Sequence, residues 1–205
     1  VGDDLKDSPT NSTDSSDDAV GNYATLNPLS GFGTLSNGNL DNTGSATDWR
    51  TRPGTFGMSS GKWYFEWTNK GGTTHIIGIG TSQIAGAGYV GDNTYGYGYY
   101  SANGQKYNSA SGSAYGNTWT TGDIIGVAFD ADAGNLYFYK NGTAQNSGTA
   151  AFTGLTSGPY FPAIGLNGTS NTGSINFGQA PFTFTPPSGY KALCTQNLTD
   201  PTIAD

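Results

Sequence analysis

The sequence of 205 residues predicts an all-β fold with little or no helix. Nearly every apolar run is roughly four to eight residues long and is closed by Gly, Asn, Ser or Pro. No window of about a dozen residues keeps a 3.6-residue apolar period without an interrupting Gly. Turn residues recur between the runs at regular spacing, which is typical of an antiparallel β-sandwich or barrel built as one domain.

The chain is expected to begin with an acidic flexible linker or arm at residues 1–20, where Asp stands among Ser, Thr and Asn with little to bury. An Asp-rich loop could also bind Ca²⁺, but the spacing lacks the regular ligand pattern of the best-known loop, so a solvated linker is favoured. The globular domain is predicted over residues 21–195, and residues 196–205 are predicted to form a C-terminal linker.

The strands are expected in chain order after an Asn37-Gly38 turn. Residues 62–67 form the most β-prone segment, and alternation places Trp63, Phe65 and Trp67 on one face, with Tyr64 and Glu66 on the other. Further short strands are predicted at residues 75–80, 95–101, 124–129, 136–139, 160–166 and 174–177.

Residues 122–142 are predicted to form a complete β-hairpin. Two apolar runs flank residues 130–135, whose Asx side chains and Gly134 suit a tight turn. Asn141-Gly142 supplies a second turn signal. Asp130 and Asp132 are therefore interpreted as turn residues rather than as ligands or acids.

Charge and composition exclude several classes of function. The formal net charge is −7, and the eight Lys and Arg are scattered, so nucleic acid is not an expected partner. One histidine, His75, and one cysteine, Cys194, provide too few ligands for a Cys/His zinc site, and no metal or other cofactor is expected. No apolar run approaches the roughly 20 residues that cross a bilayer, so no membrane insertion is expected.

Catalytic chemistry is not expected either. Glu66 is the only glutamate and has no acidic neighbour on its strand face, whereas a glycosidase needs two facing carboxylates. His75, at the start of a strand, is interpreted as structural or solvated rather than as the base of a triad.

A series of segments in order resembles the SPRY (B30.2-like) domain family from about Leu26 to Leu193. Gly61-Lys-Trp-Tyr-Phe-Glu66 resembles its first core strand, residues 77–80 its second, residues 95–107 its "WGY" segment, and residues 122–142 its best-known hairpin; residues 160–164 and 175–178 follow in order. The resemblance implies a bent antiparallel sandwich of the concanavalin-like jelly-roll type. It also implies a recognition surface on loops at one end, without catalytic machinery.

The flanks, residues 7–11 with 23–29 and residues 193–202, are similar to SPRY-like segments of large bacteriophage structural proteins. The first hypothesis is therefore a recognition module at the virion surface, in a tail fibre, tail tip or head appendage. It would bind a host-surface glycan or protein as part of a larger assembly, either monomeric or oligomeric. Two alternatives stay open: a decoration domain that contacts other virion proteins, and a SPRY adaptor that binds a short peptide.

The candidate ligand residues are aromatic and polar groups near residue 90. Tyr89 stands among glycines with few neighbours expected to bury it, and the family resemblance places its loop at a ligand pocket. Tyrosines at 95, 97 and 99 alternate with glycines, and the glycine face must lie against something. The tyrosines can pack on the other sheet or form a binding platform. The predicted ligand residues are Tyr89, Asp92, Asn93, Tyr95, Tyr97 and Asn167.

Overall fold

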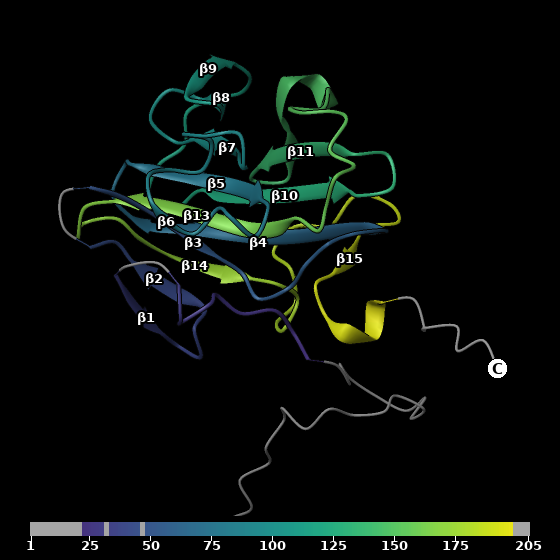
Figure 1. The fold of residues 1–205 in the computed structure, drawn as a ribbon, viewed down its shortest axis with the longest axis horizontal. Coiled ribbons are helices and arrows are strands. Elements are labelled where there is room, and N and C mark those ends of the chain that lie inside the picture. Colours follow the sequence, from purple (N-terminus) through teal and green to yellow (C-terminus); the bar gives the residue numbers. More distant parts are fainter. Residues whose placement is uncertain (1–21, 31–32, 46–47, 199–205) are drawn as a thin grey trace, which may run out of the picture.

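The computed structural model describes residues 22–30, 33–45 and 48–198, and it is a sandwich of two β-sheets (Figure 1). The first sheet runs in the order β1 (Thr34–Ser36), β2 (Asp41–Thr43), β14 (Thr172–Asn176), β4 (Lys62–Gly71), β10 (Ile124–Asp130), β11 (Asn135–Lys140) and β12 (Thr143–Ala144). These pairs are antiparallel, and β15 (Lys191–Ala192) pairs with β4 in parallel.

The second sheet is antiparallel throughout. Its order is β6 (Gly86–Ala87), β3 (Trp49–Pro53), β13 (Phe161–Asn167), β5 (His75–Gly80), β7 (Gly96–Tyr100), β8 (Gln105–Asn108) and β9 (Ser111–Ala114). The helical residues described are two 3₁₀ turns, η1 (Gln145–Gly148) and η2 (Thr195–Asn197). The all-β prediction is confirmed, and in the described part of the chain no helix could cross a membrane.

The core lies between the sheets and follows from strand alternation. Phe65 and Trp67 of β4, which alternation places on one face of the strand, are fully buried there. From the second sheet, Tyr99 meets Phe138 of β11 with ring centroids 5.2 Å apart, so aromatic contacts join the two layers.

The hairpin predicted at residues 122–142 is present as β10 and β11, paired from Ile125 opposite Lys140 to Asp130 opposite Asn135. Its aspartates have structural partners: Asp130 accepts the Ala133 N–H within the turn at 3.0 Å, and Asp132 accepts the N–H of Gly61, before β4, at 2.8 Å. Asn141 and Gly142 both have positive φ, 48° and 77°, as a two-residue primed turn requires. The hairpin is therefore scaffold.

The outer face of the first sheet is covered by the segment that follows β14. The Glu66 carboxylate, 2% exposed, accepts the N–H groups of Thr183 and Phe184 at 2.9 Å each, and the Tyr64 hydroxyl at 3.1 Å. The ring of Phe182 packs edge-on against Tyr64, with centroids 5.0 Å apart. Glu66 thus holds a covering segment onto the sheet.

The predicted linker at residues 1–20 lies outside the described residues, and so does most of the predicted C-terminal linker at residues 196–205. The proposed domain boundaries stay predictions.

Candidate functional site

The loop that carries Tyr89 lies over the outer face of the second sheet. We call residues 81–93 the flap; they include β6, which pairs with β3. The flap side chains Ile84 and Val90 are buried against the bare glycine face of β7: a Cβ on Gly98 would lie 2.5 Å from the Val90 carbonyl oxygen, and one on Gly96 would lie 2.4 Å from Ile84 Cδ1. The glycines are therefore needed for close approach of the flap, while Tyr99 faces the core.

Tyr89 is less isolated than the sequence indicates. Its ring lies 5.7 Å from the ring of Trp49 and 5.7 Å from that of Tyr107, and it is half-buried. Burial and the nearby Asp92 raise its pKa, and burial raises the pKa of Asp92. Aromatic residues far away in the sequence, and not its glycine neighbours, bury Tyr89. The spacing of residues around Tyr89 does not show these contacts.

The six predicted ligand residues do not converge at one point. Asn93 caps the turn before Tyr95, which is 39% exposed, by accepting its N–H at 2.9 Å. Tyr97 packs on the other face of the second sheet, where its ring lies 5.2 Å from Phe152. Asn167, at the end of β13, pairs with Trp49. Ligand binding by these six residues stays a prediction.

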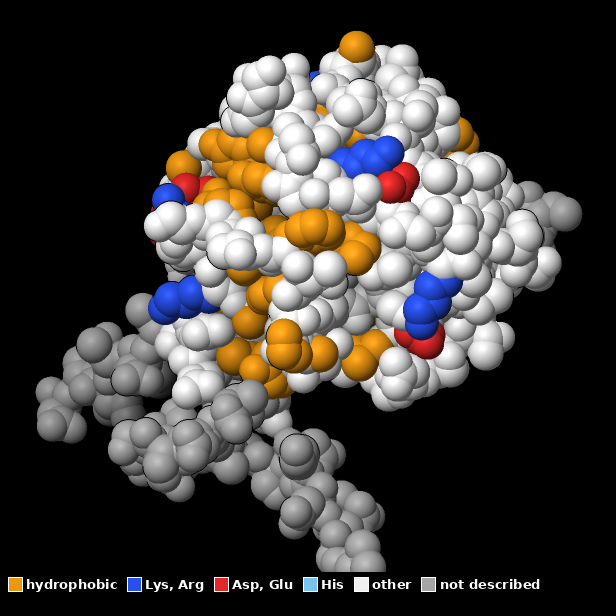
Figure 2. Space-filling view, turned by 180° about the vertical axis from the view of Figure 1, so that it is seen from behind, with side chains coloured by type: hydrophobic (Ala, Val, Ile, Leu, Met, Phe, Trp, Pro, Cys, Tyr) orange, Lys and Arg blue, Asp and Glu red, His pale blue; other side chains and the backbone are white. Residues whose placement is uncertain are grey.

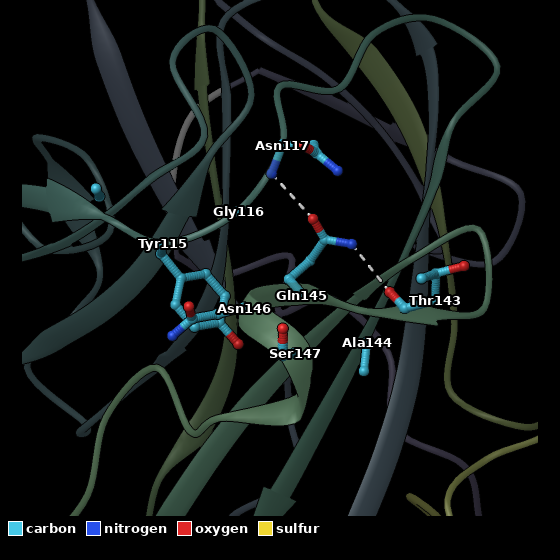
Figure 3. A pocket seen from close by; sticks show the side chains of 9 residues that line it. Tyr115, Gly116, Asn117, Thr143, Ala144, Gln145, Asn146 and Ser147 are labelled. Carbon is cyan, nitrogen blue, oxygen red and sulfur yellow. Dashed lines mark hydrogen bonds between the residues drawn. The ribbon is translucent and has the colours of Figure 1, made fainter.

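A pocket of about 420 Å³ lies elsewhere, where the two sheets end on the same side of the sandwich. Figure 1 shows β8 and β9 on the same side of the sandwich as β11 and the coiled ribbon that follows it. Residues 114–117, which begin with the last residue of β9, form one wall, and residues 143–147, in β12 and η1, form the other (Figure 3). None of the nine lining residues is charged.

Gln145 joins the two walls and is 4% exposed. Its Oε1 atom accepts the Asn117 N–H at 2.9 Å, and its Nε2 atom donates to the Thr143 carbonyl oxygen at 2.9 Å (Figure 3). The Tyr99 hydroxyl donates to the Asn117 carbonyl oxygen and lies 3.4 Å from Gln145 Oε1. These bonds fix the floor of the pocket before any ligand arrives, which lowers the entropy cost of binding.

Two exposed residues of the pocket have unusual backbone conformations. Asn146 and Ser147 have φ of 49° and 52° and ψ of 43° and 31°, both in the left-handed region, and Gly148 follows with φ of 79°. Left-handed conformation costs a non-glycine residue about 1–2 kcal/mol. Other turns of the described chain hold non-glycine residues in the same region, so the conformation fixes the shape of this rim and does not by itself identify a ligand site.

The pocket has polar groups but no acid–base pair. Its lining offers amides and hydroxyls. The phenol of Tyr115, whose pKa burial raises to about 12, is already engaged: it donates to the Thr149 carbonyl oxygen and accepts the Phe138 N–H. Among the described residues, no cluster of three or more His, Cys, Asp or Glu is placed to hold a metal ion. This chemistry suits hydrogen bonding to a ligand.

Charge elsewhere on the surface is sparse and mostly paired. On the face in Figure 2, basic side chains stand singly, most of them beside an acidic one. The ion pairs of the described residues include Lys70 with Asp41 at 3.0 Å and Lys140 with Asp123 at 3.1 Å. The described surface thus offers no basic stripe for a phosphate backbone.

The sequence reasoning missed the pocket residues. Gln145 and Asn146 lie in a polar stretch after an Asn-Gly turn, and nothing local shows that they meet residues 114–117. The one local feature that indicates an unusual turn here is Asn146-Ser147-Gly148, because these residue types tolerate a left-handed backbone.

A sequence profile of the SPRY domain matches residues 62–180, more than half of the 205-residue chain. This range contains both walls of the pocket and the flap.

Similar curated proteins come from plants, animals and fungi. The chain is 40% identical over 83 residues to the E3 ubiquitin-protein ligase RKP of Arabidopsis thaliana, which is 38% of this chain and 6% of that protein. It is 34% identical over 109 residues to Ran-binding protein 9 of Xenopus tropicalis, 53% of this chain and 19% of that protein. It is 39% identical over 70 residues to protein ssh4 of Sclerotinia sclerotiorum, 34% of this chain and 13% of that protein. The chain thus spans a small part of these relatives' length.

Proposed function

Because this chain belongs to the SPRY domain family, a family of protein-interaction modules, we propose that it is a non-catalytic adaptor domain that binds a short peptide segment of a partner protein. The binding site is the pocket between residues 114–117 and 143–147.

The observation that carries this proposal is the construction of the pocket. Gln145 fixes its two walls, and the exposed strained residues Asn146 and Ser147 present polar side chains at its rim. The pocket is more polar than most small-molecule sites, and its fixed amide and hydroxyl groups suit hydrogen bonds to a peptide backbone at a low entropy cost. Because the lining is uncharged and lacks an activated nucleophile, it supports recognition rather than reaction.

The relatives favour the adaptor over the virion setting of the sequence analysis. Those named above come from a plant, a frog and a fungus, and none supports a phage protein or a host glycan as partner. The virion-surface location stays a prediction from the flanking segments. The name of RKP gives a ligase activity to that whole protein, and this chain matches only 6% of its length.

A bead-displayed library of random 12-residue peptides tests the proposal. The probe is the tightest-binding peptide selected with the 205-residue chain, and its affinity is measured by fluorescence anisotropy. Asn117→Trp places an indole at the exposed mouth of the pocket and should weaken binding at least about tenfold, the equivalent of about 1.4 kcal/mol.

Ser188→Trp is the matched control, because Ser188 is exposed and does not line the pocket. This variant should bind the probe like the unchanged chain. The proposal is overturned if the library yields no binding peptide, or if Asn117→Trp binds the probe as well as Ser188→Trp does.

A further inference from the structure

The strand that leads into the pocket has an open edge. β9 pairs with β8 on one side only and ends the second sheet, and its four residues, Ser111 to Ala114, are all exposed. The other three strands at the ends of the two sheet paths, β1, β6 and β12, are two or three residues long. β9 is therefore the longest terminal strand among the described residues.

The direction of the free backbone groups follows from the hairpin. Ser109 and Ala110 form a two-residue turn with φ of 54° and 57°, so the flanking pair, Asn108 with Ser111, exchanges both hydrogen bonds. Alternation makes Lys106 with Ser113 the next bonded pair. The N–H and C=O groups of Gly112 and Ala114 therefore point away from β8, and no partner for them lies in the described part of the chain.

This edge lacks most of the usual protection against pairing. Natural sheets blunt their edges with very short strands, lysine, proline, bulges or a covering segment. The shortness of β9, at four residues, is the one such device present, and its length still provides two residues with outward backbone groups. β9 reads Ser-Gly-Ser-Ala, which offers small side chains and a regular register with β8. Such an edge can accept another extended chain through main-chain hydrogen bonds.

From this geometry we propose that the partner peptide binds as an extended strand, paired with the free edge of β9 at Gly112 and Ala114, and continues into the pocket. The inference rests on the proposed function and names how that site holds its ligand. Ala114 belongs both to β9 and to the pocket lining, so the edge and the pocket are continuous.

The side-chain environment beside β9 adds a preference. Gly112 pairs with Tyr107, and a Cβ on Gly112 would lie 2.7 Å from Tyr107 Cζ, so the Tyr107 ring leans over the glycine. Directly opposed residues of an antiparallel pair share a face, so the peptide residue opposite Gly112 meets this half-buried ring. Because Gln105 Oε1 lies 2.6 Å from the same Cβ position, an aromatic residue with a polar group, tyrosine or tryptophan, fits there best.

A second copy of this chain is the less suitable occupant. Two β9 strands paired about a two-fold axis would join only four residues from each chain. A stable interface between proteins buries about 1,200–2,000 Å², which a contact of this length does not reach by itself. A peptide gains the pocket in addition to the edge.

Ala114→Pro tests the pairing, because it removes one outward N–H, and proline is tolerated where an edge N–H faces solvent. With the selected 12-residue peptide as probe, this variant should bind at least about tenfold more weakly. Ser188→Trp is again the control, because Ser188 is exposed and lies outside both β9 and the pocket; it should bind within about threefold of the unchanged chain.

An N-methyl scan of the same peptide decides the case even if Ala114→Pro fails to fold. Methylation should weaken binding at alternate residues and leave the residues between them nearly unaffected, because a strand turns every second N–H toward its neighbour. If the peptide binds and Asn117→Trp weakens it, but Ala114→Pro and all methylated peptides bind normally, the β9 inference fails while the proposed function stands. Sedimentation showing a dimer that Ala114→Pro dissolves would replace the peptide with a second copy.

Discussion

At the scale of single residues, the only glutamate of the chain works as a structural acceptor. The Glu66 carboxylate is fully engaged by two backbone N–H groups and the Tyr64 hydroxyl, so its oxygens do not face an open site. Burial and the neighbouring Glu66 carboxylate raise the pKa of Tyr64 far above its ordinary value. The sequence argument against a two-carboxylate hydrolase thus gains a physical reason.

Glu66→Ala should lower the free energy of unfolding by about 3 kcal/mol, because two backbone donors lose a charged acceptor. Glu66→Gln keeps one carbonyl oxygen and should cost about half as much. Urea unfolding followed by tryptophan fluorescence measures both variants. An alanine variant as stable as the unchanged chain would contradict the clamp role of Glu66.

His75 is the second residue whose role the structure settles as packing. Its side chain is fully buried, its Nε2 atom lies 2.8 Å from the Gly71 carbonyl oxygen, and the rings of Trp67 and Trp119 lie 6.0 and 5.7 Å away. Burial lowers its pKa to about 4. The folded state therefore favours the neutral ring, while the unfolded chain binds a proton near pH 6.5.

Stability should consequently rise with pH between about 4 and 6.5, where the unfolded state carries the extra proton, by about 3 kcal/mol in total. His75→Gln keeps an N–H donor for Gly71 and should remove this slope. The difference between the two unfolding curves isolates His75 from the carboxylates. Asp41 and Asp130, for example, have lowered pKa values and lose their stabilisation at lower pH. Parallel curves for the two proteins would contradict this assignment.

At the scale of elements, β7 has an aromatic face and a glycine face, and the flap covers the glycine face. β7 sends Tyr99 into the core and leaves Gly96 and Gly98 bare, and the flap fills the bare face with Ile84 and Val90. The flap is therefore packed against the outer face of the second sheet.

Gly98→Ala should displace the flap, because the new Cβ would lie 2.4 Å from Ile76 Cγ2 and 2.5 Å from the Val90 carbonyl oxygen. Overpacking of this kind costs about 1–3 kcal/mol. Gly165→Ala is the control under the same flap, because its Cβ would come no closer than 3.3 Å, to the Val90 nitrogen. Amide hydrogen exchange at Val90 should accelerate in the first variant only; equal exchange in both would show that the flap is not seated on Gly98.

The fold could be predicted from local pattern, and the pocket could not. Alternation in residues 62–67 and turn residues between 130 and 142 act within a few positions, so the sequence shows them directly. The pocket depends on Gln145 reaching Asn117, 28 residues away, and on two sheets ending on the same side. Tyr89 likewise meets Trp49 and Tyr107 only after the sheet forms.

At the scale of the whole molecule, the sandwich leaves one side open, where β9 and β12 end their sheets and the pocket lies between them. The outer faces of the two sheets are covered, by the flap over the second sheet and by residues 182–184 over the first. Under the proposal, a partner peptide would meet free backbone groups and a preformed polar pocket together at this open side.

The most direct test is an NMR titration of the ¹⁵N-labelled 205-residue chain with the selected 12-residue peptide. The largest chemical-shift changes are predicted for the backbone amides of residues 112–117 and 143–147, which form the β9 edge and the pocket. Changes confined to the flap around Tyr89 and Asp92, with residues 112–117 unmoved, would contradict the account and return the site to the loop that the sequence first indicated.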